Sequence, residues 1–441
     1  MVNGALENKH IHLVFKDKMK NGYRGHWKYT LIWIIIIITL SYKTKIIDEP
    51  AIRQLYLPGI AFLLVLLGAP LYAFASNHMR LYTKNAVDQY PFYILILIIL
   101  YNLAVAYRVY PETFRAALYV FSTPLLVILY AIRCAIFIGC ERLLQSVSSS
   151  VVYFAFLNLA FTIVSIYVPE VTQYIGITSI DAGYGIRPVG IVGDPTFFGA
   201  LFSFSLLLYL LTNHKRNYLI IFVLVVGAIF SGSRNAILSF LASFLVGMLV
   251  NGGNILKIIR EIIIFSLSIV VIGLNVLYFF VDFNFDFYYV VNELFRSDDE
   301  GAYIRIEYWT ELLRLALSSN FFEILLGGEG GVSYISNSFG SPYNGFLRIY
   351  FNHGFIVLIT YMVAIIVLLL QIINDKNLNA RKINISLFTY WFVFSQFYDS
   401  AFGEFFHVAE FAMYLALATI FSRSIYMKSS GNSAMEFNIK K

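Results

Sequence analysis

The sequence is poor in charge: only 13% of its 441 residues are charged, whereas 59% are hydrophobic. A soluble domain does not carry so much apolar surface. The composition therefore excludes an ordinary soluble protein and predicts an all-α polytopic membrane protein. We therefore expect membrane lipid as a partner and no nucleic acid.

Cysteine is also scarce, and the histidines do not form a metal-binding pattern. The two cysteines, Cys134 and Cys140, are six residues apart and predict neither a disulfide framework nor a metal site. The seven histidines are scattered, with no spacing typical of metal ligands. We therefore predict no metal and no cofactor.

Long runs of apolar residues make up most of the sequence. A spanning helix needs roughly 17–25 mostly apolar residues, and this template predicts about twelve transmembrane helices. They fall at residues 29–45, 54–76, 90–108, 114–133, 149–168, 196–212, 217–232, 235–250, 258–281, 344–373, 384–400 and 404–423.

The basic tail, residues 1–28, has no cleavable-signal pattern and is predicted to stay in the cytoplasm. An even number of spans puts the second tail, residues 424–441, on the same side. Roughly two thirds of the 32 Lys and Arg residues then lie on that side, as the positive-inside rule expects.

Two polar segments fall on the opposite side, residues 169–195 and 282–343. The second is too long for a simple turn between two spans. It has an amphipathic helical pattern over Ile304–Leu317 and a glycine cluster at Gly327–Gly331. We interpret this large, partly helical outer loop as the working part of the protein. We interpret the glycine cluster as a flexible turn. Its spacing matches no P-loop, so the alternative of a phosphate-binding loop has only a weak signal.

Four arginines on the outer side run against the charge bias: Arg187, Arg234, Arg305 and Arg348. A guanidinium at the membrane edge is costly unless it is paired, snorkels or faces a polar cavity, and it binds phosphate bidentately. Two arginines at the starts of different helices could hold one diphosphate. The alternatives are a snorkelling Arg234 and ion pairs for Arg305 and Arg348.

Three further residues have both a structural and a functional interpretation. Asp194 before Pro195 is a pattern typical of a helix start, and its carboxylate is also a candidate base. Tyr343 and Asn344 precede the tenth span, where they could cap the helix or meet a sugar.

In order along the chain, three stretches resemble the superfamily of O-antigen polymerases (Wzy) and O-antigen ligases (WaaL). The first runs from Arg187 through Gly-Asp-Pro-Thr-Phe-Phe-Gly, and the second is Ser231-Gly-Ser-Arg234. The third comprises Arg305 to Trp309, the glycine cluster, Ser341-Pro-Tyr-Asn-Gly-Phe-Leu and Asn352-His-Gly. The ligases have a histidine before the asparagine of the exit motif, where this chain has Tyr343, and that departure favours the polymerases.

The resemblance implies a metal-independent glycosyltransferase of C-type architecture in the bacterial inner membrane, with its active site on the periplasmic face. Donor and acceptor would be undecaprenyl-diphosphate-linked oligosaccharides, and a chain-length regulator is an expected partner. The family's diphosphate-holding arginines correspond to Arg187 and Arg234, with Arg305 as a third candidate.

The general base stays open between three residues, His353, Asp194 and Glu329. Tyr343, Asn344, Arg348 and Glu329 are the predicted substrate-binding residues. Three other functions stay open: an oligosaccharide ligase or oligosaccharyltransferase, a lipid-linked oligosaccharide flippase, and a scaffold protein. The unlike halves and nearly charge-free spans speak against a carrier.

Overall fold

The computed structural model describes a mostly helical bundle. The described residues are 30–34, 36–37, 127–128, 130–132, 134–135, 138–168, 179–181, 186–188, 190–192, 195–213, 217–250, 310–311, 314, 325, 344–396, 410–420 and 422. Predictions for the spans at 54–76, 90–108 and 258–281 lie outside these residues.

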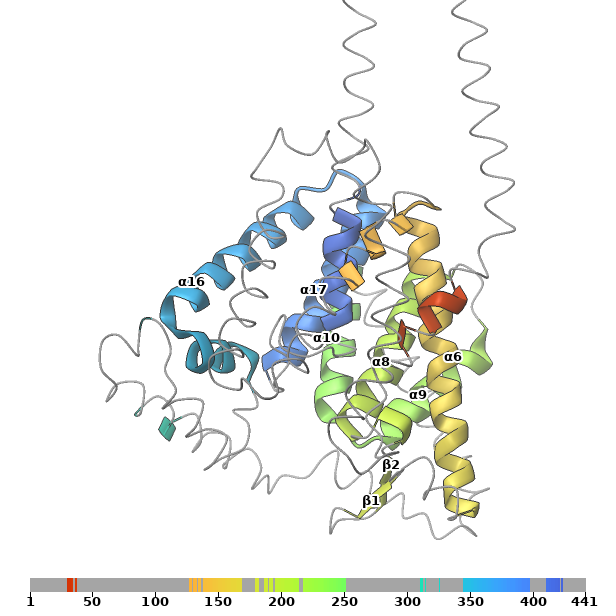
Figure 1. The fold of residues 1–441 in the computed structure, drawn as a ribbon. Coiled ribbons are helices and arrows are strands. Elements are labelled where there is room, and N and C mark those ends of the chain that lie inside the picture. The colour runs from red at the N-terminus through yellow and green to blue at the C-terminus, as the bar shows by residue number, and fades with distance from the viewer. Residues whose placement is uncertain are drawn as a thin grey trace, which may run out of the picture.

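Figure 1 shows the described elements in space. The long elements are α6 (Cys140–Tyr167), α8 (Pro195–Thr212), α9 (Tyr218–Phe230), α10 (Arg234–Val250), α16 (Gly345–Ile373) and α17 (Leu378–Gln396). A further helix covers Glu410–Ile420. Between α6 and α8 lie β1 (Ser179–Asp181), β2 (Ile186–Pro188) and the 3-10 turn η3 (Gly190–Val192).

Three of these helices are long and apolar enough to cross a membrane. They are formed by residues Cys140–Val164, Pro195–Thr212 and Gly354–Ile373. The helices α9, α10 and Glu410–Ile420 are apolar but shorter. The described part of the chain thus agrees with a helical protein that has membrane-spanning segments.

Several helix boundaries agree closely with the sequence prediction, but two helices start earlier than predicted. Helix α6 begins at Cys140 rather than at residue 149, and α17 begins at Leu378 rather than at residue 384. In α6 the early turns contain the buried serines Ser146, Ser148 and Ser150. Their hydroxyl groups lower the hydropathy that the span prediction reads, while the bundle still buries them.

The two short strands form an antiparallel hairpin that the sequence did not predict. Ile180 lies opposite Arg187, and Asp181 lies opposite Ile186. Strand β2 and turn η3 contact α8, and η3 also contacts α6. Figure 1 draws this hairpin at the lower end of the bundle. The segment that carries Arg187 is therefore attached to the described bundle.

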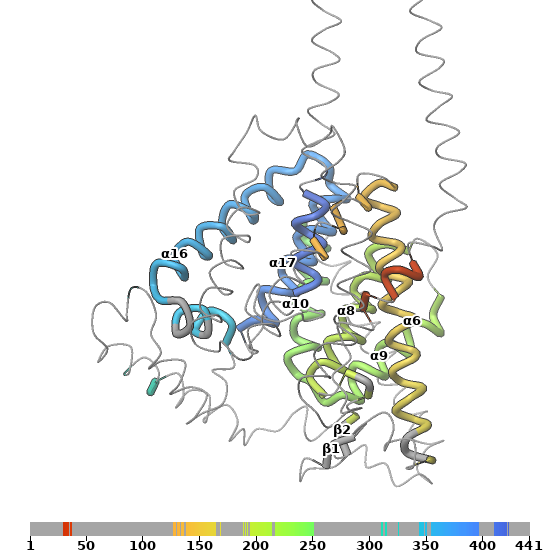
Figure 2. Tube along the Cα trace, viewed as in Figure 1, coloured from red at the N-terminus to blue at the C-terminus, as the bar shows by residue number. Residues whose placement is uncertain are grey.

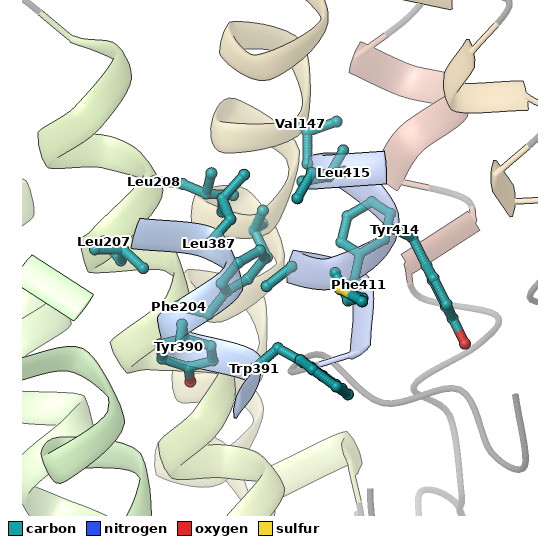
Figure 3. Packing of buried hydrophobic residues seen from close by; sticks show 14 of the residues in the cluster. Val147, Phe204, Leu207, Leu208, Leu387, Tyr390, Trp391, Phe411, Tyr414 and Leu415 are labelled. Atoms are coloured by element: carbon teal, nitrogen blue, oxygen red, sulfur yellow. The ribbon is translucent and has the colours of Figure 1, made fainter. Parts of the chain in front are cut away.

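The main hydrophobic core lies where α6, α8, α17 and Glu410–Ile420 meet, as Figure 3 shows. The Phe204 ring lies 5.4 Å from the Tyr390 ring and 6.3 Å from the Phe411 ring, measured between centroids. Within this apolar environment the Tyr390 hydroxyl donates to Ala200 O at 3.0 Å and lies 2.7 Å from Ser203 Oγ. A buried polar group without such partners would be costly.

Small residues allow α10 to approach α17 closely. Ser239, Ser243 and Gly247 follow one another at intervals of four residues, and all three are buried. A Cβ atom added to Gly247 would collide with Ser386 Oγ of α17. Small residues let two helix backbones approach closely. In a membrane this matters because lipid provides no hydrophobic driving force for helix association, so close packing must stabilise the contact.

The tube in Figure 2 follows the same path from α8 to α17. Helices α8, α10 and α16 begin, and α17 ends, towards the same end of the bundle, which we call the hairpin end. It is defined by the starts of α8 and α10 at Pro195 and Arg234, the start of α16 at Gly345 and the end of α17 at Gln396.

Candidate functional site

The turn Ser231–Ser233 joins α9 to α10 at the hairpin end. Gly232 has a φ of 62°, a left-handed conformation that glycine adopts without strain. Ser231 Oγ donates to Ala228 O at 2.6 Å and accepts from the Ser233 amide at 3.1 Å. Ser233 Oγ accepts from the Ala236 amide at 3.4 Å. The Ser-Gly-Ser sequence is thus a structural turn, and it fixes Arg234 as the first residue of α10.

The first turn of α8 packs directly against this Ser-Gly-Ser turn. A Cβ atom added to Gly199 would come within 2.7 Å of Ser233 Cβ and would collide with Ser231 Oγ. Both serine side chains are buried, with exposed fractions of 0% and 3%. Because buried hydrogen-bonded turns have little freedom to move, the backbone that carries Arg234 is held in one position.

The hairpin end of α6 supports the segment that carries Arg187. Gly190 has a φ of 57° and lies against the Asn158 side chain of α6 and the Phe198 ring of α8. A Cβ atom there would come within 2.8 Å of Asn158 Cγ and 3.1 Å of Phe198 Cδ2. The close approach anchors η3 immediately after β2, so the Arg187 backbone and the Arg234 turn both lie beside the start of α8.

The end of α17 completes the described part of the site. Asn235 Nδ2 donates to Phe394 O at 3.1 Å, and Asn344 Nδ2 donates to Gln396 O at 3.1 Å. Both amide groups donate to backbone carbonyl oxygens in the last turn of α17 as the structure describes it. One asparagine follows Arg234 on α10 and the other precedes α16.

Asn344 is the predicted site residue that the structure describes most fully. Its Oδ1 accepts from the Phe346 and Leu347 amides at 3.0 and 3.1 Å, so it caps α16. Of the two interpretations that the sequence left open, capping is confirmed, and contact with a sugar stays a prediction. Likewise, Pro195 is the first residue of α8, as the Asp-Pro pattern predicts.

The remaining predicted site residues are described to different extents. Arg234 is described and half-buried. For three residues only the backbone is described: Arg187 lies in β2, and Arg348 and His353 lie in α16. Four lie outside the described residues: Asp194, Arg305, Glu329 and Tyr343. The Arg187 strand and the Arg234 turn therefore both lie against α8, whereas Asn344 and the residue after Arg234 both bind the end of α17.

His353 precedes a break in α16. Gly354 has a φ of 82° and a ψ of 177°, so the helix has two segments that meet at this residue. The first segment, Gly345 to His353, starts at the hairpin end, and the second continues as the apolar span. The kink places the backbone of this candidate base directly before the apolar span Gly354–Ile373.

The large outer loop is described at four residues. Residues 310, 311, 314 and 325 are helical, which agrees with the predicted amphipathic helix at three positions. Glu311 Oε2 and Arg314 Nε lie 3.8 Å apart with the arginine side chain 80% exposed. Such exposed pairs contribute at most about 1 kcal/mol, so this pair marks a solvated helix face rather than a site.

Two features of the site were not predicted as functional from sequence. The sequence predicts no functional role for Asn235, the first residue of the predicted span 235–250, and it predicts no strands in the outer segment 169–195. The side-chain amide of Asn235 donates to a carbonyl 159 residues away, so no local sequence pattern indicates that role. Among the described residues, no group of three or more His, Cys, Asp or Glu side chains could hold a metal ion.

The arrangement has a clear chemical capacity. Arg234 is a permanent cation with five N–H donors, held by a rigid turn at the end of an apolar bundle. Such a group binds carboxylate or phosphate without a metal ion. Comparison with protein-family models and with curated proteins gives no match for the chain.

Proposed function

We propose that the chain is a polysaccharide polymerase of the O-antigen polymerase type. It joins undecaprenyl-diphosphate-linked oligosaccharide repeat units at the periplasmic face of the bacterial inner membrane. In this proposal about twelve spans hold the large loop, residues 282–343, on the periplasmic side, with both tails in the cytoplasm. The architecture is that of a C-type glycosyltransferase. The family resemblance and the positive-inside bias support this placement.

One observation carries the proposal: Arg234 sits on a buried, hydrogen-bonded turn that packs against α8, and the strand that carries Arg187 contacts the same helix. Two arginine-bearing segments, distant in sequence from the loop, thus reach one end of an apolar bundle. A diphosphate attached to a lipid needs a cationic site next to membrane-spanning helices, and this end of the bundle supplies both.

The reaction follows from the charge distribution. A hydroxyl oxygen of the acceptor sugar attacks the anomeric carbon of the donor, a new C–O bond forms, and the bond from that carbon to the diphosphate oxygen breaks. The lipid diphosphate departs with the electron pair, while the acceptor proton passes to a base. Attack opposite the leaving group inverts the anomeric centre.

The arginines act on the leaving group. As the anomeric bond breaks, negative charge grows on the diphosphate, and fixed guanidinium donors stabilise that charge more strongly in the transition state than in the ground state. His353, Asp194 and Glu329 are the candidates for the base. Arg305 is a third candidate for the diphosphate, and Tyr343, Asn344, Arg348 and Glu329 are candidates for sugar contacts.

The test is a polymerisation assay with purified protein. We expect wild type in detergent, given a lipid-diphosphate-linked repeat unit and EDTA, to produce a ladder of products on a gel. Arg187→Ala and Arg234→Ala should each lower kcat by about 10²–10³-fold, the usual cost of removing one donor to a developing negative charge. Arg234→Lys keeps the charge but not the bidentate geometry and should lie in between.

Arg381→Ala is the matched control. Arg381 is on α17 at the opposite end of the bundle, where its Nη1 donates to Ile373 O at 3.2 Å. This variant should polymerise like wild type when compared at equal folded concentration. If wild type gives no ladder but moves lipid-linked sugar across reconstituted vesicles, the protein is a flippase and the polymerase proposal is wrong.

A further inference from the structure

Both Asn235 and Asn344 bind the last turn of α17, and together they form what we call the α17 clamp. The clamp consists of Asn235 Nδ2 on Phe394 O and Asn344 Nδ2 on Gln396 O. Each asparagine bridges residues far apart in sequence and belongs to the start of a different helix. These hydrogen bonds join α17 to the starts of α10 and α16, and the Phe346 ring at the start of α16 also packs against the Trp391 and Phe392 rings of α17.

The two hydrogen bonds of the clamp reach α17 from opposite sides. Carbonyl groups two residues apart in an α-helix are turned by about 200° around the axis, so they lie on nearly opposite sides. Contacts between the helices agree, because α17 packs against α10 and also against α16. The end of α17 therefore lies between the Arg234 turn and the start of α16.

Each asparagine also holds its own helix start. Asn344 Oδ1 caps α16, while Asn235 Oδ1 lies 3.3 Å from Ser239 Oγ, one turn further along α10. An asparagine can do both at once because its amide has an acceptor oxygen and a donor nitrogen. An aspartate keeps the acceptor but loses the donor, and it would place negative charge against a carbonyl oxygen.

The chemistry of the α17 end gives the clamp a role. The C-terminal end of a helix carries partial negative charge on its unsatisfied carbonyl oxygens. Arg234 directly precedes Asn235, so the arginine turn lies beside this end. The two amide groups donate to carbonyl oxygens there and fix the spacing between the arginine turn and α16.

We propose that Asn235 and Asn344 are positioning residues that fasten the Arg234 turn and the start of α16 to the end of α17. A displacement of the Arg234 turn is then coupled to a displacement of the start of α16. The effect on catalysis rests on the proposed polymerase function, whereas the mechanical coupling does not. Neither residue needs to touch the reacting atoms.

The coupling is tested by amide hydrogen exchange of the full-length protein in detergent. Asn344→Asp should keep the amides of residues 346–347 protected, because the cap remains. It should speed exchange in the last turn of α17 and in residues 231–236 by about 5- to 10-fold, the ratio expected for one lost hydrogen bond. Asn235→Asp should speed exchange in the same segments and also near residues 344–347.

Asn377→Asp is the matched control on the same helix. Asn377 Oδ1 accepts from the Ala380 amide at 3.1 Å at the start of α17, and the substitution keeps this acceptor. Exchange at residues 231–236 should stay as in wild type. If Asn344→Asp changes exchange only within residues 344–347, the coupling across α17 is refuted.

A kinetic measurement separates positioning from simple loss of fold. At equal folded concentration, Asn235→Asp and Asn344→Asp should raise the KM for a lipid-diphosphate-linked donor about tenfold, with a smaller change in kcat. Unchanged KM with less folded protein would mean that the clamp is only structural and would overturn the positioning role. If even wild type transfers no sugar, the proposed function fails, and the exchange result still decides the coupling.

Discussion

Gly190→Ala should disturb the Arg187 segment by two separable effects. Gly190 has a φ of 57°, and an alanine in this left-handed region costs roughly 1–2 kcal/mol. Its Cβ would also lie 2.8 Å from Asn158 Cγ and 3.1 Å from Phe198 Cδ2. Overpacking of this kind typically costs about 1–3 kcal/mol. Together the free energy of unfolding should fall by about 2–5 kcal/mol.

Gly139→Ala separates the two effects. Gly139 has a φ of 88°, and no described heavy atom lies within 4 Å of the Cβ position, so only the backbone cost of roughly 1–2 kcal/mol applies. Asn158→Ala combined with Gly190→Ala removes the side chain that the new methyl group would strike. The double variant should therefore be more stable than the two single losses predict when added.

The assay is reversible unfolding in mixed detergent, followed by the polymerisation ladder at equal folded concentration. We expect Gly190→Ala to be less stable than Gly139→Ala by about 1–3 kcal/mol and to polymerise more slowly. Equal stability of the two variants would refute the reasoning, because it would mean that Asn158 and Phe198 do not hold η3 against α6 and α8.

Two further substitutions test the packing that supports the site. Gly247→Ala should lower the free energy of unfolding by about 1–3 kcal/mol through its collision with Ser386, and Ser386→Gly in the same chain should restore most of the loss in the detergent titration. Tyr390→Phe removes the hydroxyl that donates to Ala200 O and meets Ser203 Oγ. It should cost about 0.5–1.5 kcal/mol by the same measurement, and no loss would show that this buried hydrogen bond contributes nothing.

The sequence predicts best where a local pattern has a local consequence. Pro195 starts α8, Asn344 caps α16 and the Ser-Gly-Ser sequence makes a turn before Arg234, and each was readable from neighbouring residues. The start of α6 at Cys140 could not be predicted from the hydropathy of the sequence. Its serines have the low hydropathy typical of a loop, yet Ser150 Oγ lies within hydrogen-bond distance of two carbonyl oxygens, Ser146 O at 2.7 Å and Thr30 O of the first described helix at 2.9 Å.

The helical, apolar character of this chain, the starts of α8, α10 and α16 and the arginines that oppose its charge bias follow from the sequence alone. Which helix ends meet follows only from the packing of the helices. Asn235 and Asn344 bind Phe394 O and Gln396 O, which are 159 and 52 residues away in the chain. These pairings depend on which helices pack together, because a backbone carbonyl oxygen accepts a suitable donor from any segment that packing brings near, and no local sequence pattern specifies that segment.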